Sequence, residues 1–188
     1  EREAWRAGYE FSHSFNDDWQ FRQNSRYMQS RINRHGTWPG SLNNGGFGTR
    51  LNMNAYDRYN KSIVYSLDNQ LEGKFQLGSV ENTVLLGASY DRTSFNQDWD
   101  AGFAGTIDVY NPVYLRDPLT PLAVQNTLLE QQMKGVYAQI QSKYDHWLFL
   151  LGGRQDWVDS DYRDKVKPSS NINSQDRKFT YQGGVMYQ

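Results

Sequence analysis

The side chains that most often carry out chemistry are few and widely spaced in this sequence. Its 188 residues contain no cysteine, and the histidines are His13, His35 and His146. No two of them have the spacing of a zinc-ligand pair, and no GxSxG segment presents a serine nucleophile. The glycines around Phe47 lack the Lys-Ser/Thr pair of a phosphate-binding loop. The residue types therefore predict no catalytic residue, and we expect a protein that is not an enzyme.

One run of carboxylates is spaced closely enough to suggest a cation site. It consists of Asp156, Asp159, Asp161 and Asp164. A calcium loop places acidic residues at alternate positions and needs a glycine for its turn. Here Arg163 interrupts the run and no glycine follows it. Solvated loop charge explains the run better, so we predict no metal ligands.

Composition limits the class of protein. Aromatic residues make up 15% of the chain, yet the hydrophobic fraction is only 37% and the mean hydropathy is -0.85. Few aliphatic side chains are available to pack around the large rings in a water-soluble core, while so many aromatics argue against disorder. Lys and Arg total 20 against 21 Asp and Glu, so no global field attracts nucleic acid. No apolar run approaches the roughly 18 residues of a membrane helix.

The dominant pattern is an alternation of apolar and polar side chains with a period of two. Between Trp5 and Phe11, for example, the apolar residues occupy odd positions. This period predicts β-strands rather than helices. We expect an all-β chain with seven strands and no helix, over residues 5–11, 19–33, 63–75, 82–95, 136–144, 147–157 and 179–187.

The expected connections alternate between two sizes. Short ones fall at 16–18, 77–81 and 145–146, and long ones at 33–54, 96–126 and 159–176. Compact soluble domains seldom carry several long unstructured loops, whereas outer-membrane β-barrels combine short periplasmic turns with long extracellular loops. The pattern therefore favours an antiparallel transmembrane barrel. The alternative is a soluble antiparallel barrel with one buried face.

Aromatic residues near the expected strand ends support the membrane interpretation. Trp5, Trp19, Tyr144, Trp147 and Tyr187 occupy such positions. Amphipathic rings are enriched where a membrane meets water. A soluble sheet explains neither this placement nor the two sizes of connection.

Several stretches resemble one family. Gly135–Gln139 (GVYAQ) and Leu151–Trp157 (LGGRQDW) look like a hairpin of the TonB-dependent siderophore receptors. Phe179–Val185 resembles the strand that follows it in that family, and Trp19–Arg26 and Val109–Val113 are similar to the ferrichrome-type branch. The matches occur in the family's order over nearly the whole sequence.

The resemblance implies a 22-stranded outer-membrane barrel filled by a plug domain. Such a receptor imports ferric siderophores of the hydroxamate type, energised by the TonB–ExbB–ExbD complex. It needs no cofactor of its own, contacts membrane lipid and lipopolysaccharide, and does not bind nucleic acid. Because no plug or TonB box is recognisable, we expect residues 1–188 to be a central part of the barrel domain, without the plug and the remaining strands. The alternative is a surface barrel for adhesion or phage docking that transports nothing.

Candidate binding residues follow from the resemblance. A ferric chelate already coordinates its iron, so the receptor should offer aromatic surface and hydrogen-bond donors. The candidates come from the expected outer loops: Trp38, Trp99, Phe103, Tyr110 and Tyr114, with Phe47 beside them. Packing of these rings against one another is the competing explanation.

Charged residues are expected on the lumenal side of the strands. They are Arg22, Arg26, Arg92, Arg154 and Asp156. They would attract an anionic ligand or pair with the plug. The competing explanation is pairing within the barrel with Glu10, Asp68 and Asp156 on neighbouring strands.

Overall fold

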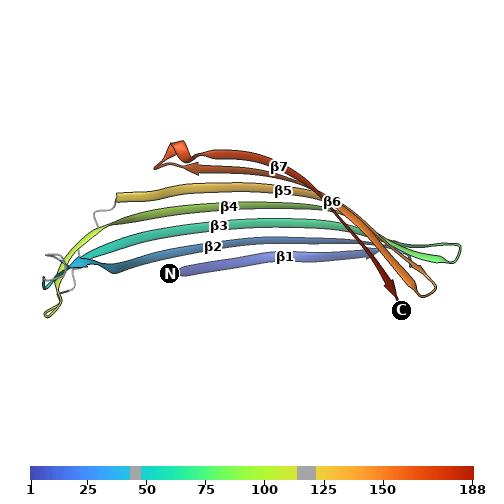
Figure 1. The fold of residues 1–188 in the computed structure, drawn as a ribbon, viewed down its shortest axis with the longest axis horizontal. Coiled ribbons are helices and arrows are strands. Elements are labelled where there is room, and N and C mark those ends of the chain that lie inside the picture. Colours follow the sequence, from blue (N-terminus) through green and yellow to red (C-terminus); the bar gives the residue numbers. More distant parts are fainter. Residues whose placement is uncertain (43–47, 114–121) are drawn as a thin grey trace.

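The chain forms one antiparallel sheet in which the strands follow one another in sequence order. The structure, a computed structural model, describes residues 1–42, 48–113 and 122–188. Within these ranges lie β1 (Arg2–Ser14), β2 (Trp19–Leu42), β3 (Arg50–Leu77), β4 (Val80–Asp108), β5 (Leu122–Tyr144), β6 (Trp147–Asp164) and β7 (Ile172–Tyr187). The strands bow together into one long arc (Figure 1). The seven predicted strands are confirmed, and the described residues add one short 3-10 helix, Pro168–Ser170.

The predicted long loops are mostly wrong, because the strands continue far into them. β2 extends to Leu42 and β3 begins at Arg50, which leaves only 43–49 between them. The other two connections shrink in the same way, to 109–121 and 165–171. In these extensions the regular apolar alternation has ended, while the backbone ladder continues.

The short connections are confirmed as tight turns at one end of the sheet (Figure 1). Residues 78–79 and 145–146 are two-residue turns between adjacent strands. Gly78 and Asp145 adopt positive φ angles of 60° and 52°, as hairpin turns of this length require. At the third turn, the Asn16 side-chain oxygen accepts hydrogen bonds from the backbone amides of Asp18 and Trp19.

The register assigns each strand residue to one of two faces, since directly paired residues of an antiparallel sheet lie on the same side. One row crosses β2 to β5 with apolar side chains throughout: Phe21, Leu71, Leu86 and Ala138. We call this side the apolar face. The adjacent row lies on the opposite side, which we call the polar face: Arg22, Gln70, Gly87, Tyr137 and Arg154.

Nothing in the described part of the chain covers the apolar face. Leu86, Val136 and Leu151 on this face expose 43%, 49% and 64% of their surface, and no hydrophobic side chain among the described residues is buried. A water-soluble sheet has to bury one face against another layer, whereas lipid tails cover the outside of a membrane barrel. This exposure argues against the soluble alternative. Among the described residues, no helix is both long and apolar enough to cross a membrane.

Aromatic rings border the apolar face toward both of its ends. Near the tight turns, the ring centroids of Trp147 and Tyr187 are 5.0 Å apart. Toward the other end, those of Trp5 and Tyr27 are also 5.0 Å apart. These are the two levels at which a barrel strand meets the membrane surfaces.

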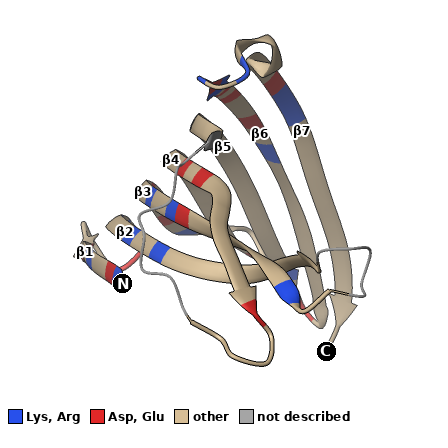
Figure 2. Cartoon of the chain, turned by 90° about the vertical axis from the view of Figure 1, so that its left-hand side faces the viewer, with Lys and Arg blue, Asp and Glu red and all other residues tan. Residues whose placement is uncertain are grey.

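The strands continue well past the apolar band. On β3 the band reaches from Phe75 to Ile63, and the next residue on that face is Lys61. A membrane strand needs only about 9–11 residues to cross, and β3 has 28. In Figure 2 the charged residues occupy short parts of the strands and leave long uncharged stretches between them. The strand ends that carry the longer connections therefore project beyond the lipid.

Candidate functional site

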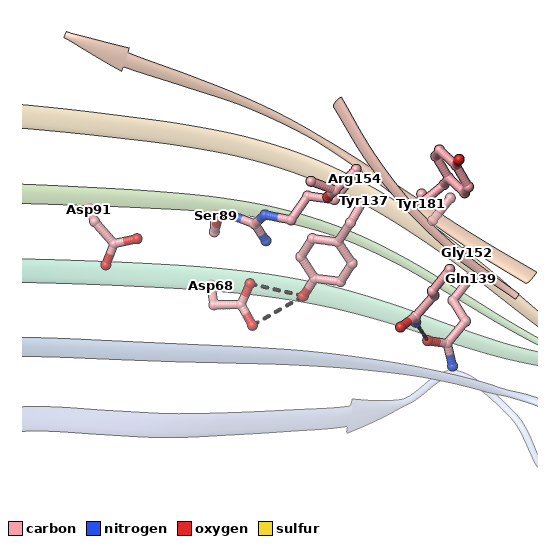
Figure 3. Close-up of a pocket in the computed structure, with 12 residues that line it drawn as sticks. Asp68, Ser89, Asp91, Tyr137, Gln139, Gly152, Arg154 and Tyr181 are labelled. Carbon is pink, nitrogen blue, oxygen red and sulfur yellow. Dashed lines mark hydrogen bonds between the residues drawn. The ribbon is translucent and has the colours of Figure 1, made fainter. Parts of the chain in front are cut away.

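A network of polar side chains crosses four strands on the polar face. The Tyr137 hydroxyl on β5 donates to Asp68 on β3, with O–O distances of 3.0 and 3.2 Å to the two carboxylate oxygens. The side chain passes over β4 at Gly87, where an added Cβ would lie 2.0 Å from the tyrosine ring. Figure 3 shows the ring directed at Asp68. Glycine at position 87 is thus what allows β5 to contact β3.

Arg154 on β6 extends the same network. Its Nε donates to Asp156 Oδ1 over 2.8 Å, and its Nη2 donates to Ser89 Oγ on β4 over 2.8 Å. Its guanidinium carbon lies 5.4 Å from the centroid of the Tyr137 ring. An added Cβ on Gly135 would lie 2.3 Å from the guanidinium, so a glycine again makes the crossing possible. We call Asp68, Ser89, Tyr137, Arg154 and Asp156 the wall network.

All members of the wall network except Asp156 line a shallow hollow of about 620 Å³, which continues into a second hollow of about 630 Å³ toward β1. The two hollows share Asp68, Ser89 and Asp91. Their lining offers hydroxyl, amide, carboxylate and guanidinium groups. Such a surface can hydrogen-bond a polar partner over a broad area.

Most of the predicted lumenal charges share the polar face. Arg22, Arg26, Arg154 and Asp156 lie there by register. Arg22 Nη2 contacts Glu72 Oε2 at 2.6 Å, and Arg154 Nη2 contacts Asp156 Oδ1 at 2.7 Å. Charge pairing within the sheet is thus observed, but with partners other than the predicted ones: Arg22 pairs with Glu72 rather than with Glu10 or Asp68, and Asp156 lies on the same strand as Arg154 rather than on a neighbouring one.

The prediction for Arg92 is wrong. Arg92 pairs in register with Tyr65, on the apolar face, and forms an ion pair with Glu130 at 3.3 Å. Its charge suggested a lumenal position, although its even number places it with Tyr90 on the same strand. Arg92 lies just past the end of the apolar band. A charged side chain therefore occurs there on the apolar face because the strand has passed the end of that band.

Aromatic residues gather on the polar face at the projecting ends of β2, β3 and β4. Trp38 and Phe103 both pair with Asn54, and Trp99 pairs with Arg58. Tyr56 is on the same face, with its ring centroid 5.7 Å from that of Trp38. We call Trp38, Tyr56, Trp99 and Phe103 the mouth cluster. Trp38 and Phe103 remain 38% and 59% exposed, so their faces are available to a ligand.

Tyr110 lies beyond the mouth cluster. It follows the end of β4 and is 87% exposed. Its backbone amide and that of Asn111 donate to Asp108 Oδ1 over 2.9 and 3.3 Å. The hydrogen bond from Tyr110 is the main cause that holds the pKa of Asp108 below its ordinary value. The two remaining candidates, Tyr114 and Phe47, fall outside the described residues.

Sequence reasoning missed Tyr56, because position 56 follows a segment assigned to a loop. Extending the alternation of β3 backward from Asp68 through Ser66, Ser62 and Asn60 reaches Tyr56 on the polar face. The strand register therefore indicates the position of Tyr56, although the residues around it lack the apolar alternation that identifies a strand in the sequence.

The aspartate run does not converge on one point. Asp156 and Asp164 lie on the polar face, whereas Asp159 and Asp161 lie on the opposite face. Among the described residues, no group of three or more His, Cys, Asp and Glu side chains could hold a metal ion.

Comparison with known proteins shows which proteins this chain is similar to. A family model described as "TonB dependent receptor-like, beta-barrel" matches residues 1–188. The ferrichrome outer membrane transporter/phage receptor of Escherichia coli K12 is 29% identical over 96% of this chain and 27% of its own length. The ferrioxamine B receptor of Salmonella typhimurium LT2 is 33% identical over 87% of this chain and 23% of its own length. The chain thus spans about a quarter of the length of these relatives.

A solved structure shows the same fold. The siderophore receptor PiuA from Acinetobacter baumannii superposes with a TM-score of 0.71 and 18% identity, over 100% of this chain and 30% of that one. The location in the bacterial outer membrane that the sequence predicts agrees with this fold and with the exposed apolar face. Family model, relatives and fold agree, and the chain belongs to the TonB-dependent receptor-like β-barrel family.

Proposed function

We propose that this chain forms part of the wall and mouth of an outer-membrane receptor that binds a ferric siderophore of the hydroxamate type and imports it. The observation that carries the proposal is the mouth cluster, which continues the polar face beyond the lipid. In this proposal the polar face lines the lumen of a 22-stranded barrel. A plug domain fills the lumen and responds to the TonB–ExbB–ExbD complex. The names of the ferrichrome and ferrioxamine relatives support the choice of ligand class.

In this proposal the mouth has to recognise the ferric chelate and does not have to carry out a reaction on it. In a hydroxamate chelate the ligand's own oxygens fill the coordination sphere of the iron, so a receptor should add no metal ligand. Aromatic faces can pack against the compact chelate while nearby donors orient it. We assign the chain no bond-making step and no cofactor, and the iron is cargo.

The apolar face is proposed to contact lipid, with lipopolysaccharide in the outer leaflet. Lys61 is the first residue beyond the apolar band on β3, and Lys134 lies next to Tyr90 in the register. Arg92 lies at a similar level on β4. Cations just beyond an aromatic border are placed to meet phosphate groups of the membrane surface.

The direct test is removal of the Trp38 ring. In the full receptor that contains this chain, we expect Trp38→Ala to weaken binding of a ferric trihydroxamate about tenfold, since one aromatic contact is lost. Binding is measured by titration of the purified receptor in detergent, and uptake by accumulation of radioactive iron in cells.

The matched control is Trp157→Ala, because Trp157 lies on the apolar face, away from the mouth. It should leave affinity unchanged. Unaltered affinity of Trp38→Ala for ferrichrome and ferrioxamine B would remove Trp38 from the site.

A second candidate function is phage docking without transport. The Escherichia coli relative is named a phage receptor as well as a transporter, and Tyr110 and Val113 beyond β4 are 87% and 67% exposed. Cells that adsorb phage through the receptor but accumulate no iron from any hydroxamate chelate would favour this candidate.

A further inference from the structure

Two arginines lie directly opposite each other at the mouth. Arg34 on β2 and Arg58 on β3 are register partners on the polar face. The Cβ atoms of such a pair are about 4.5–5.5 Å apart, and like charges in this arrangement repel. The mouth therefore holds a local excess of positive charge that the sheet itself does not require.

Two other arginines of the polar face have a carboxylate partner, whereas Arg26 has none within the described residues. Arg22 is paired with Glu72 and Arg154 with Asp156. Within the described residues, neither Arg34 nor Arg58 is in an ion pair. Their charges remain available to a group that enters from outside the sheet.

Arg58 is held in place although its charge is not neutralised. Its Nη2 donates to Gln97 Oε1 over 2.8 Å, and Gln97 is only 8% exposed. The Gln97 amide nitrogen in turn donates to Gln125, which fixes its orientation. The Arg58 Nε is buried and has no hydrogen-bond partner. A buried guanidinium nitrogen without an acceptor is costly, so the sheet itself does not satisfy every donor of the Arg58 guanidinium.

The arginines adjoin the mouth cluster. Trp99 is the register partner of Arg58 on β4, and Tyr56 lies two residues along β3 on the same face. Aromatic surface and two cations thus border one region. Guanidinium groups donate to carboxylates through paired N–H bonds.

We propose that Arg34 and Arg58 form an anion-binding subsite of the mouth, which takes a carboxylate or similar anionic oxygen group at the periphery of the ferric chelate. The charge of the chelate then contributes to selectivity, in addition to its shape. This inference rests on the proposed function, because it assigns the subsite to the same ligand.

The test uses three complexes with one iron centre and different outer charge. Ferrioxamine B with its free amine is cationic, its acetylated form is neutral and its succinylated form is anionic. At low salt we expect the full receptor to bind the succinylated complex about tenfold more tightly than the amine form. In the double variant Arg34→Gln/Arg58→Gln this preference should fall to about twofold or less, with the neutral complex least affected.

Arg31→Gln is the matched control, because Arg31 lies on the same strand but on the apolar face. It should keep the preference of the wild type, and surface labelling confirms that every variant reaches the outer membrane. A double variant that retains the wild-type charge preference would overturn the inference and leave the proposed function intact. Failure of the wild type to bind any of the three complexes would overturn both.

Discussion

Tyr137 reaches Asp68 because Gly87 leaves the space between them empty. Any larger residue at position 87 must displace the ring, since even a methyl carbon would lie 2.0 Å from it. The wall network thus depends on one residue that has no side chain. Neither composition nor the alternation of side chains predicts this role, because glycine on a polar face looks like any other small residue.

The first prediction at the residue scale concerns Gly87→Ala. We expect this change to break the Tyr137–Asp68 hydrogen bond and to lower the free energy of unfolding by about 1–3 kcal/mol through overpacking. Unfolding of the full receptor by urea in detergent measures the change. Gly184→Ala is the control, since no atom lies within 4 Å of a Cβ added at Gly184. Equal stability of the two variants would contradict the close approach of the ring.

Single residues also show where sequence reasoning succeeds and fails. Arg154 and Arg92 are both charged strand residues, yet they lie on opposite faces. For Arg154 the alternation and the charge agree. For Arg92 they disagree. The alternation is then the better guide, because successive side chains of a strand point to opposite faces unless a bulge intervenes. Tyr137 crosses over β4 only because β3, β4 and β5 are paired in one particular register. No local stretch of sequence specifies that register.

At the scale of the strand, the sequence predicts the part that crosses the membrane and misses the part beyond it. On β4 the alternation of Val84, Leu86 and Ala88 with polar residues identifies the strand, and lipid on one side is the cause of that pattern. Beyond Phe95 water reaches both faces, and the alternation ends: polar residues follow on the former apolar face, while Trp99 and Phe103 of the mouth cluster lie on the other. The strand persists there through hydrogen bonds to β3 and β5.

The prediction at this scale compares two adjacent residues of β4. Leu86 lies on the apolar face, and Leu85 pairs with Glu72 and Gln139 on the polar face. We expect Leu86→Arg to lower the free energy of unfolding in lipid bilayers by about 2–4 kcal/mol, the cost of a cation near the middle of the membrane. Leu85→Arg should cost much less, because its charge meets polar groups. A larger loss of stability for Leu85→Arg would reverse the assignment of the two faces.

At the scale of the whole molecule, the sheet is held together by its ladders of backbone hydrogen bonds rather than by an apolar core. β3 pairs with β2 and β4 over most of its length, whereas β1 and β7 each have a neighbour on one side only within the described residues. Stability should therefore be graded across the sheet, with its maximum at β3 and β4. Unpaired strand edges have no place in lipid, so the grading depends on what lies beside β1 and β7.

Amide hydrogen exchange tests this grading. In the isolated chain, refolded in detergent, we expect the amides of β3 and β4 to exchange slowest and those of β1 and β7 fastest, because the outer strands open without breaking a second ladder. In the full receptor, neighbouring strands should slow exchange in β1 and β7 to the level of β3. The difference separates two sources of protection, since detergent covers the apolar face in both samples while only the full receptor completes the ladders. Equal protection of all strands in the isolated chain would mean that lipid-like contact, rather than strand pairing, stabilises the sheet.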